Sequence, residues 1–226
     1  MQMTTRRGFM VGMSAAGALV LLPRHVDAAM RYDRRALDII LHRPARHRQV
    51  VAVEHVKNGS TLRKIVNSLN GYAFGYGEGP GTMHVVVVLY DTGVLLGLGD
   101  RSWRENNLYD IALAASDPIR GVMRVPGNPF LHAPSGLSTH DDPDNPRGFY
   151  QDTSIDTLRA RGVDVLVCDN ALRATVRRIA TSHGAANVDD VAKRLHTDLI
   201  PGALLVPAGV TALDAAQEAH FTFLPG

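Results

Sequence analysis

Apolar residues follow two patterns that alternate along this chain, continuous runs and a spacing of three or four positions. Mainly apolar runs, typical of strands buried on both faces of a parallel sheet, occupy 49–53, 84–89 and 163–167. Apolar residues spaced three or four positions apart predict helices over 32–42, 104–115, 152–161, 170–181 and 210–219, and a further helix that begins near Ser60. Short strands are predicted over 203–206 and, at a sheet edge, over 221–224. This alternation predicts a single three-layer α/β domain with a mostly parallel sheet of four or five strands.

Segment 116–150 interrupts the alternation. It holds six of the 12 prolines, His132, His140 and the acidic run Asp141, Asp142 and Asp144. We predict a long loop here, and long loops in compact domains are commonly functional. The histidines and acids offer nitrogen and oxygen ligands to a divalent metal, but their spacing matches no tight ligand motif. We therefore expect a solvated loop and no bound metal.

Two glycine-rich stretches, 71–81 and 93–99, are predicted to be loops. The first follows a helix and precedes a strand, which is the wrong order for a dinucleotide-binding turn. The second follows a strand but lacks both the Gly-x-Gly-x-x-Gly pattern and a Lys-Ser/Thr ending. We therefore predict no nucleotide and no other cofactor.

The first 28 residues have the order of an export signal. Arg6 and Arg7 form a twin-arginine start, an apolar stretch spans 11–22, and small residues at 26 and 28 suit cleavage after Ala28. The stretch is shorter than the roughly 20 apolar residues that span a bilayer. We therefore expect a periplasmic protein with no stable membrane insertion after cleavage, and a retained anchor is the alternative. The mature chain then has a helical lead-in at 29–47 and the α/β domain at 48–226.

Charge and cysteine content exclude several functions. The chain carries 24 basic and 22 acidic residues. Removal of residues 1–28 takes away three arginines and one aspartate, so 24 − 3 = 21 basic and 22 − 1 = 21 acidic residues remain. A neutral mature chain gives no electrostatic basis for a nucleic-acid partner. The single cysteine excludes an internal disulfide and any site built from several cysteines.

That cysteine, Cys168, stands at a chemically favourable place. It follows the strand at 163–167 and precedes a helix for which Asp169 or Asn170 is the expected cap. Ligands of parallel sheets bind at the carboxyl ends of strands, and a helix N-terminus favours the thiolate. We therefore expect an exposed, nucleophilic sulfur. Asn170, Arg173 and Arg177 are the candidate substrate-binding residues, the arginines for an anionic sulfur donor such as thiosulfate. A buried, inert thiol is the alternative.

The carboxyl-terminal third carries a resemblance. Its motifs are Val163-Asp164-Val165-Leu166-Val167-Cys168-Asp169-Asn170-Ala171, Leu199-Ile200-Pro201-Gly202-Ala203, Val206-Pro207-Ala208-Gly209-Val210, Leu213, Gln217 and Phe221-Thr222-Phe223-Leu224. The chain resembles the DsrE/DsrF-like family over roughly 48–224, specifically from 163 onward. The resemblance implies a small α/β protein of sulfur relay, a trimer or hexamer, and a persulfide on Cys168. Two features depart from the family: His220 replaces a usual glycine, and segment 116–150 is longer.

Two classes of function follow. The first is an exported sulfur-handling protein, a sulfurtransferase or sulfur carrier, in which Cys168 holds sulfane sulfur received from or passed to a partner protein. The second is a non-catalytic module on the same fold that binds a small ligand, a metal or a partner through segment 116–150, with Cys168 structural. The reactivity of the thiol separates the two classes.

Overall fold

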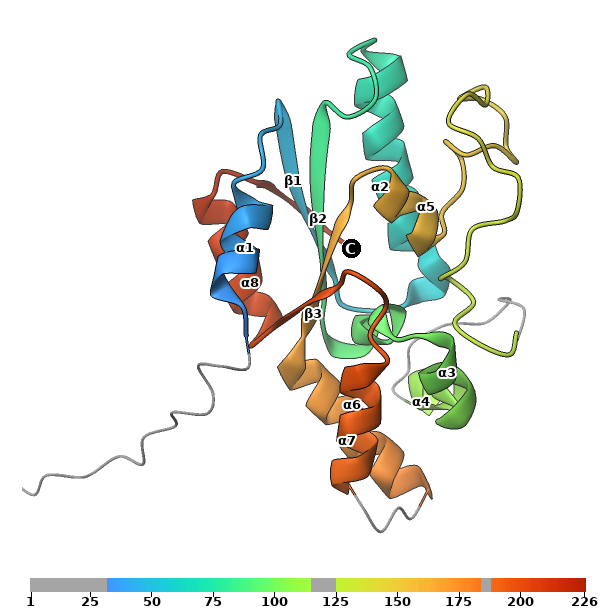
Figure 1. Ribbon diagram of the computed structural model, residues 1–226, viewed down its shortest axis with the longest axis vertical. Helices are drawn as coiled ribbons and strands as arrows, with labels where there is room; N and C mark the ends of the chain where they lie inside the picture. The colour runs from blue at the N-terminus through green and yellow to red at the C-terminus, as the bar shows by residue number, and fades with distance from the viewer. Residues whose placement is uncertain (1–31, 115–124, 184–187) are drawn as a thin grey trace, which may run out of the picture. The chain divides into compact units, whose positions relative to one another are not determined.

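A five-stranded, all-parallel sheet forms the centre of the protein (Figure 1). This computed structural model describes residues 32–114, 125–183 and 188–226. Along the sheet the strands are β4 (Leu204–Val206), β3 (Asp164–Cys168), β2 (Met83–Leu89), β1 (His47–Val53) and β5 (Thr222–Pro225). All seven residues of β2 are buried, and β5 is an edge strand that pairs only with β1. The predicted parallel α/β sheet, with 84–89 at its centre and the last strand at an edge, is confirmed.

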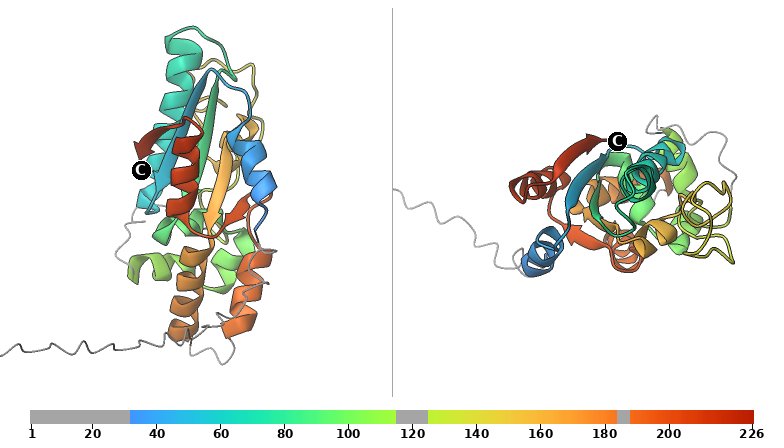
Figure 2. Two further views of the ribbon diagram at one scale, coloured as in Figure 1. Left: turned by 90° about the vertical axis from the view of Figure 1, so that its left-hand side faces the viewer. Right: turned by 90° about the horizontal axis from the view of Figure 1, so that it is seen from above.

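Helices cover both faces of the sheet, which gives three layers (Figures 1 and 2). Val85 and Val87 of β2 face the larger apolar core, and Val86 and Val88 face a smaller one. This two-sided burial explains why the strand is apolar at every position except His84, which pairs with Asp164 at 2.7 Å. The larger core includes α2 (Ser60–Asn70), α5 (Ile155–Ala160), α6 (Asp169–His183) and α7 (Val188–Thr197), and the smaller includes α1 (Arg34–Leu41) and α8 (Gly209–Glu218).

The path of the chain separates the helices that follow β3 and β4. From β1 to β4 each strand is laid down beside its predecessor, and the last step returns across the sheet to place β5 beside β1. Right-handed crossovers that run in opposite directions put their helices on opposite faces. The helix after β3, α6, therefore packs in the larger core, whereas the helix after β4, α8, packs in the smaller one. The loops after these two adjacent strands diverge.

The structure differs from the predicted elements in several places. Residues Asp91–Gly97 form a 3-10 helix, whereas 93–99 was predicted to be a loop. Residues Gly71–Gly75 form a π-helical turn that continues α2 rather than a loop, because Gly71 has ordinary helical backbone angles. The helix expected over 104–115 is two helices, α3 (Asp100–Glu105) and α4 (Leu108–Ala114), because Asn107 between them adopts a left-handed φ of 49°. Helix α7 was not predicted, although Val191 and Leu195 lie on one buried face.

Residues 125–150 form a long connection without helix or strand, as expected for the described part of segment 116–150. Asn128 fixes it to the core, because its amide nitrogen donates to the carbonyl oxygens of Leu96 and Leu98 at 3.2 and 2.8 Å. Its amide oxygen accepts the backbone N–H of Phe130 at 3.0 Å. The connection is therefore anchored at one end by a buried polar residue.

The predicted export signal and its cleavage site lie outside the described residues, as do positions 115–124. Within the part of the chain that the structure describes, every helix is too short or too polar to span a bilayer.

Candidate functional site

The divergence of the loops after β3 and β4 creates a switch point at the carboxyl edge of the sheet. Cys168 ends β3, and its partner in the neighbouring strand is Val206, the last residue of β4. Helix α6 begins at the next residue after Cys168, and α8 begins at Gly209 on the other face. Open α/β sheets bind ligands in such crevices, outside the carboxyl ends of strands where the chain changes direction. The sequence placed Cys168 at a strand end, and the fold places it at this switch point.

The thiol itself is buried rather than exposed. Cys168 is 5% exposed and belongs to the larger apolar core. Its Sγ accepts the backbone N–H of Ala171 at 3.4 Å, which is the bond that a capping side chain makes to the first turn of a helix. Cys168, and neither Asp169 nor Asn170, therefore caps α6. The expectation of an exposed sulfur is wrong because the thiol turns back under the first turn of its own helix.

Asp169 is the centre of a polar cluster beside this thiol. Its side chain is fully buried and accepts hydrogen bonds from the Tyr32 hydroxyl at 2.5 Å and from His196 Nε2 at 2.7 Å. The guanidinium of Arg173 pairs with it at 2.5 Å. Burial by itself raises the pKa of the Asp169 carboxyl, but these three donors outweigh burial and hold the pKa below its ordinary value. Asp169 is therefore an ionised group whose charge is compensated within the protein.

The donors to Asp169 come from separate parts of the chain. His196 lies on α7, and its Nδ1 faces the carbonyl oxygen of Ala192 at 2.7 Å. Both ring nitrogens of His196 therefore face oxygen atoms. Arg173 also donates to the Tyr32 hydroxyl at 3.2 Å. Sequence reasoning missed Tyr32 and His196, since Tyr32 is 137 positions from Asp169 and α7 was not predicted.

The three predicted substrate-binding residues are placed differently from one another. Asn170 and Arg177 are both exposed on α6. Asn170 lies in the first turn, close to the crevice, and Arg177 lies further along the helix. Arg173 is also on the surface, but its guanidinium is committed to Asp169 and Tyr32. An anion at this edge would therefore bind Arg173 only by competing with its ion pair to Asp169.

A cavity of about 290 Å³ lies at the same edge, between the end of β4 and helices α1 and α8. Its wall is mainly apolar and includes Leu37, Val206, Pro207 and Ala212. Tyr32 also lines it, so one residue connects the cavity with the Asp169 cluster. The cavity has the size for a ligand of about ten non-hydrogen atoms, since a water molecule occupies about 30 Å³ of liquid.

His132 and Asp141 of the long connection bond to other groups of the protein. His132 donates toward Asp100 at 2.7 Å and toward Asp156 at 3.2 Å, and the hydrogen bond to Asp100 raises its pKa. Asp141 accepts the backbone N–H groups of Phe149 and Ser138, which lower its pKa. Across 32–114, 125–183 and 188–226, no group of three or more His, Cys, Asp or Glu side chains is arranged to hold a metal ion.

Comparison of the chain with protein-family models, with curated proteins and with solved structures gives no match in any of the three. The resemblance to the DsrE/DsrF-like family therefore rests on the motifs in the sequence.

Proposed function

We propose that this protein is an exported sulfur-handling protein that carries sulfane sulfur as a persulfide on Cys168. The observation that carries the proposal is the position of Cys168 at the β3–β4 switch point, where the first turn of α6 donates a backbone N–H to its sulfur. The motifs that surround this cysteine in the sequence support the same assignment.

The surroundings of the thiol also support the proposal. The N-terminus of a 15-residue helix stabilises an adjacent anion. Asp169 would oppose a thiolate, but its charge is compensated by Arg173 and the other two donors. The helix dipole and the Ala171 N–H therefore act on the sulfur with little opposition from the neighbouring carboxylate.

The proposed transfer balances without any further oxidant or reductant. The Cys168 thiolate attacks the outer sulfur of thiosulfate, and a new sulfur–sulfur bond forms. The original sulfur–sulfur bond breaks, and sulfite leaves with its electron pair. Because the thiol is 5% exposed, we expect the reaction to require local opening at the start of α6. Transfer onward is an attack by a thiolate of the acceptor protein on the same outer sulfur.

Intact-protein mass after incubation with thiosulfate or polysulfide tests this proposal. The wild type should gain about 32 Da, the mass of one sulfur atom, and Cys168→Ser should gain nothing. The serine variant is a fair control because serine is a good helix cap, so we expect its free energy of unfolding to change by less than about 1 kcal/mol. Cys168→Ala removes the cap and should cost about 1 kcal/mol.

The same samples decide between the two classes of function. Under the sulfur-handling proposal, the native thiol reacts with iodoacetamide near neutral pH at a measurable rate. If the wild type takes up no sulfur and its thiol reacts only after unfolding, Cys168 is structural and the proposal is wrong.

The second candidate is a small-ligand-binding module with Cys168 as part of the core. Two observations favour it: the thiol is buried, and an apolar cavity of about 290 Å³ that Cys168 does not line lies at the usual ligand edge of the fold. A ligand there would contact Tyr32, so its binding should shift the Tyr32 resonances in Cys168→Ser as strongly as in the wild type.

Export and assembly remain part of the proposal. N-terminal sequencing of the protein from cells should give a chain that begins at Ala29. Replacement of Arg6 and Arg7 by lysines should block export, because the twin-arginine route depends on that pair. Sedimentation at micromolar concentration should give a trimer or hexamer, and a clean monomer would remove that expectation.

A further inference from the structure

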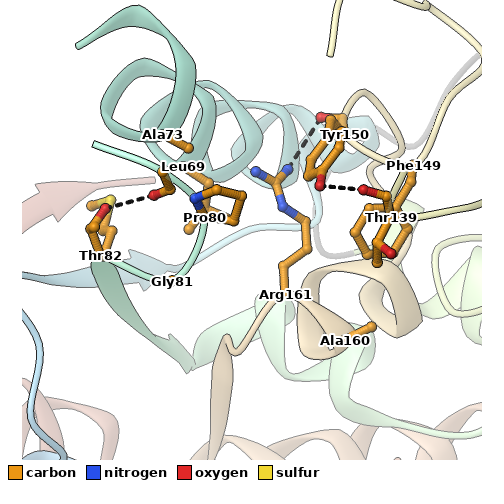
Figure 3. A pocket seen from close by; sticks show the side chains of 12 residues that line it. Leu69, Ala73, Pro80, Gly81, Thr82, Thr139, Phe149, Tyr150, Ala160 and Arg161 are labelled. Atoms are coloured by element: carbon orange, nitrogen blue, oxygen red, sulfur yellow. Dashed lines mark hydrogen bonds between the residues drawn. The ribbon is translucent and has the colours of Figure 1, made fainter. Parts of the chain in front are cut away.

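A second cavity, of about 280 Å³, lies at the opposite edge of the sheet, near the amino end of β2 (Figure 3). Its floor is Met83, the first residue of β2, and one wall is formed by Leu69 and Ala73 of α2 and the following turn. The facing wall consists of Phe149 and Tyr150 from the long connection. Neither Cys168 nor any residue of the Asp169 cluster lines it. It is therefore separate from the site described above.

Arg161, which directly follows α5, directs its guanidinium into this cavity between Pro80 and Tyr150 (Figure 3). One nitrogen donates to the carbonyl oxygen of Tyr150 at 3.1 Å, and another donates to Asn70 Oδ1 at 2.6 Å. The guanidinium carbon lies 5.4 Å from the centre of the Tyr150 ring. These contacts hold the guanidinium in place, and both of its acceptors are neutral.

Among the described residues, Arg161 has no anionic partner. No carboxylate of the described residues lies within ion-pair distance of it, whereas Arg173 has Asp169 and Arg101 has Glu105. The nearby acids are engaged elsewhere, Glu78 with His47 and Arg46, and Asp141 with backbone N–H groups. Burial lowers the pKa of Arg161 to about 10, which is the direction expected for a partly buried cation without a carboxylate partner among the described residues.

We propose that this cavity binds a small organic carboxylate with a flat apolar body, whose carboxylate pairs with Arg161. A planar guanidinium with unused N–H groups matches a carboxylate in two parallel hydrogen bonds. The aromatic rings of Phe149 and Tyr150 and the aliphatic side chains of Leu69 and Met83 suit a flat apolar body. The volume limits the ligand to about ten non-hydrogen atoms, about the size of benzoate.

The walls of the cavity also indicate what binding would do to the protein. Leu69 and Ala73 belong to α2 and its turn, Arg161 follows α5, and Phe149 and Tyr150 belong to the long connection. A ligand that contacts all three segments stabilises the folded state by mass action. Binding should therefore raise the melting temperature and slow proteolysis within 125–150.

Calorimetry and NMR titration of the full chain with benzoate, benzamide and acetate test the proposal. Benzoate should bind with a Kd of about 1 mM or tighter. Benzamide has the same shape without the charge, and acetate has the charge without the ring, so both should bind at least about tenfold more weakly. Absence of saturable benzoate binding, or equal binding of benzamide or acetate, would overturn the proposal.

Variants locate the binding. Arg161→Gln should weaken benzoate binding at least about tenfold, and Arg161→Lys should fall between Arg161→Gln and the wild type because it keeps the charge but not the paired geometry. Arg101→Gln is the matched control, since it removes one exposed arginine from α3 and should leave binding unchanged. Ala73→Leu leaves Arg161 in place but fills the cavity, so it should abolish binding even if Arg161→Gln proves poorly folded. Undiminished benzoate binding in both Ala73→Leu and Arg161→Gln would show that benzoate binds elsewhere.

Discussion

At the scale of single residues, the most informative group is the buried carboxylate of Asp169. It connects the start of the described chain, through Tyr32, with α6 and α7, through Arg173 and His196. A buried charge is tolerated when its donors satisfy it, and removal of one member leaves the others unpaired. The cluster therefore contributes to stability, and the partners of Asp169 compensate its negative charge beside the Cys168 thiol.

The first prediction at this scale concerns Asp169→Asn. The amide keeps the shape but not the charge, so we expect a loss of about 2–4 kcal/mol in the free energy of unfolding at neutral pH. The loss should depend on pH. Because the folded-state pKa of Asp169 lies below its unfolded value, the stabilisation is present above about pH 4 and is lost as the pH falls through the folded-state pKa. The difference between wild type and variant should shrink below about pH 4.

Urea unfolding of both proteins at neutral pH and at a series of acidic pH values measures this effect. Asp38→Asn is the control, because Asp38 forms an exposed pair with Arg34 one turn away and should cost no more than about 0.5 kcal/mol. A pH-independent difference for Asp169→Asn would show that the loss comes from packing rather than from charge.

At the scale of elements, the ends of the helices carry the unusual features of this chain. Helix α6 is capped by a thiol, and His220, two residues after the end of α8, adopts a left-handed φ of 64°. The N–H of His220 bonds to the carbonyl oxygen of Gln217 and that of Phe221 to Ala216, the pattern of a helix that closes on a left-handed residue. The glycine that the resembled family has here would fit that backbone without strain.

The prediction for this element is that His220→Gly stabilises the protein by about 1 kcal/mol. A left-handed conformation costs a non-glycine residue about 1–2 kcal/mol, which glycine would not incur. The greater conformational freedom of glycine in the unfolded chain offsets part of this stabilisation. Thermal unfolding measures the change. Ala219→Gly is the adjacent control: Ala219 has a φ of −82° and is buried, so glycine there should destabilise. Destabilisation by His220→Gly would show that the imidazole makes a compensating contact.

At the scale of the whole molecule, the sheet order makes the protection of the strands unequal. Central β2 is fully buried and bonded to β1 and β3. Edge strand β5 bonds only to β1, and Phe223 in it is 48% exposed. Opening of an edge strand breaks fewer contacts than opening of the centre.

The prediction at this scale concerns amide hydrogen exchange. Among the strands, residues 83–89 should exchange last. Residues 222–225 of the edge strand should exchange before those of β1 and β2. Mass spectrometry of exchanged peptides at several protein concentrations measures the order. Protection of β5 that increases with concentration would indicate that another chain covers this edge, as an oligomer could. Protection of β5 equal to that of β2 at every concentration would contradict the prediction.

The local pattern of the sequence determined the elements and the class of fold. The valine run 85–88 could only belong to a strand that is buried on both sides, and the place of Cys168 between a strand and a helix was visible from its neighbours. Such features depend on residues close in sequence, whose periodicity records which faces are buried. The same reasoning missed the break at Asn107, because a single left-handed residue does not disturb the apolar spacing.

Only the tertiary structure decided which residues meet at the carboxyl ends of the strands and at the amino end of β2. The burial of the Cys168 thiol depends on the turn of its backbone into α6, and the compensation of Asp169 depends on Tyr32 and His196, which meet it only after the chain has folded. Arg161 likewise has only neutral acceptors because the folded chain places the nearby carboxylates against other partners. Contacts between residues far apart in sequence leave no periodic trace, because each partner is selected by where the crossovers place it rather than by its neighbours in the chain.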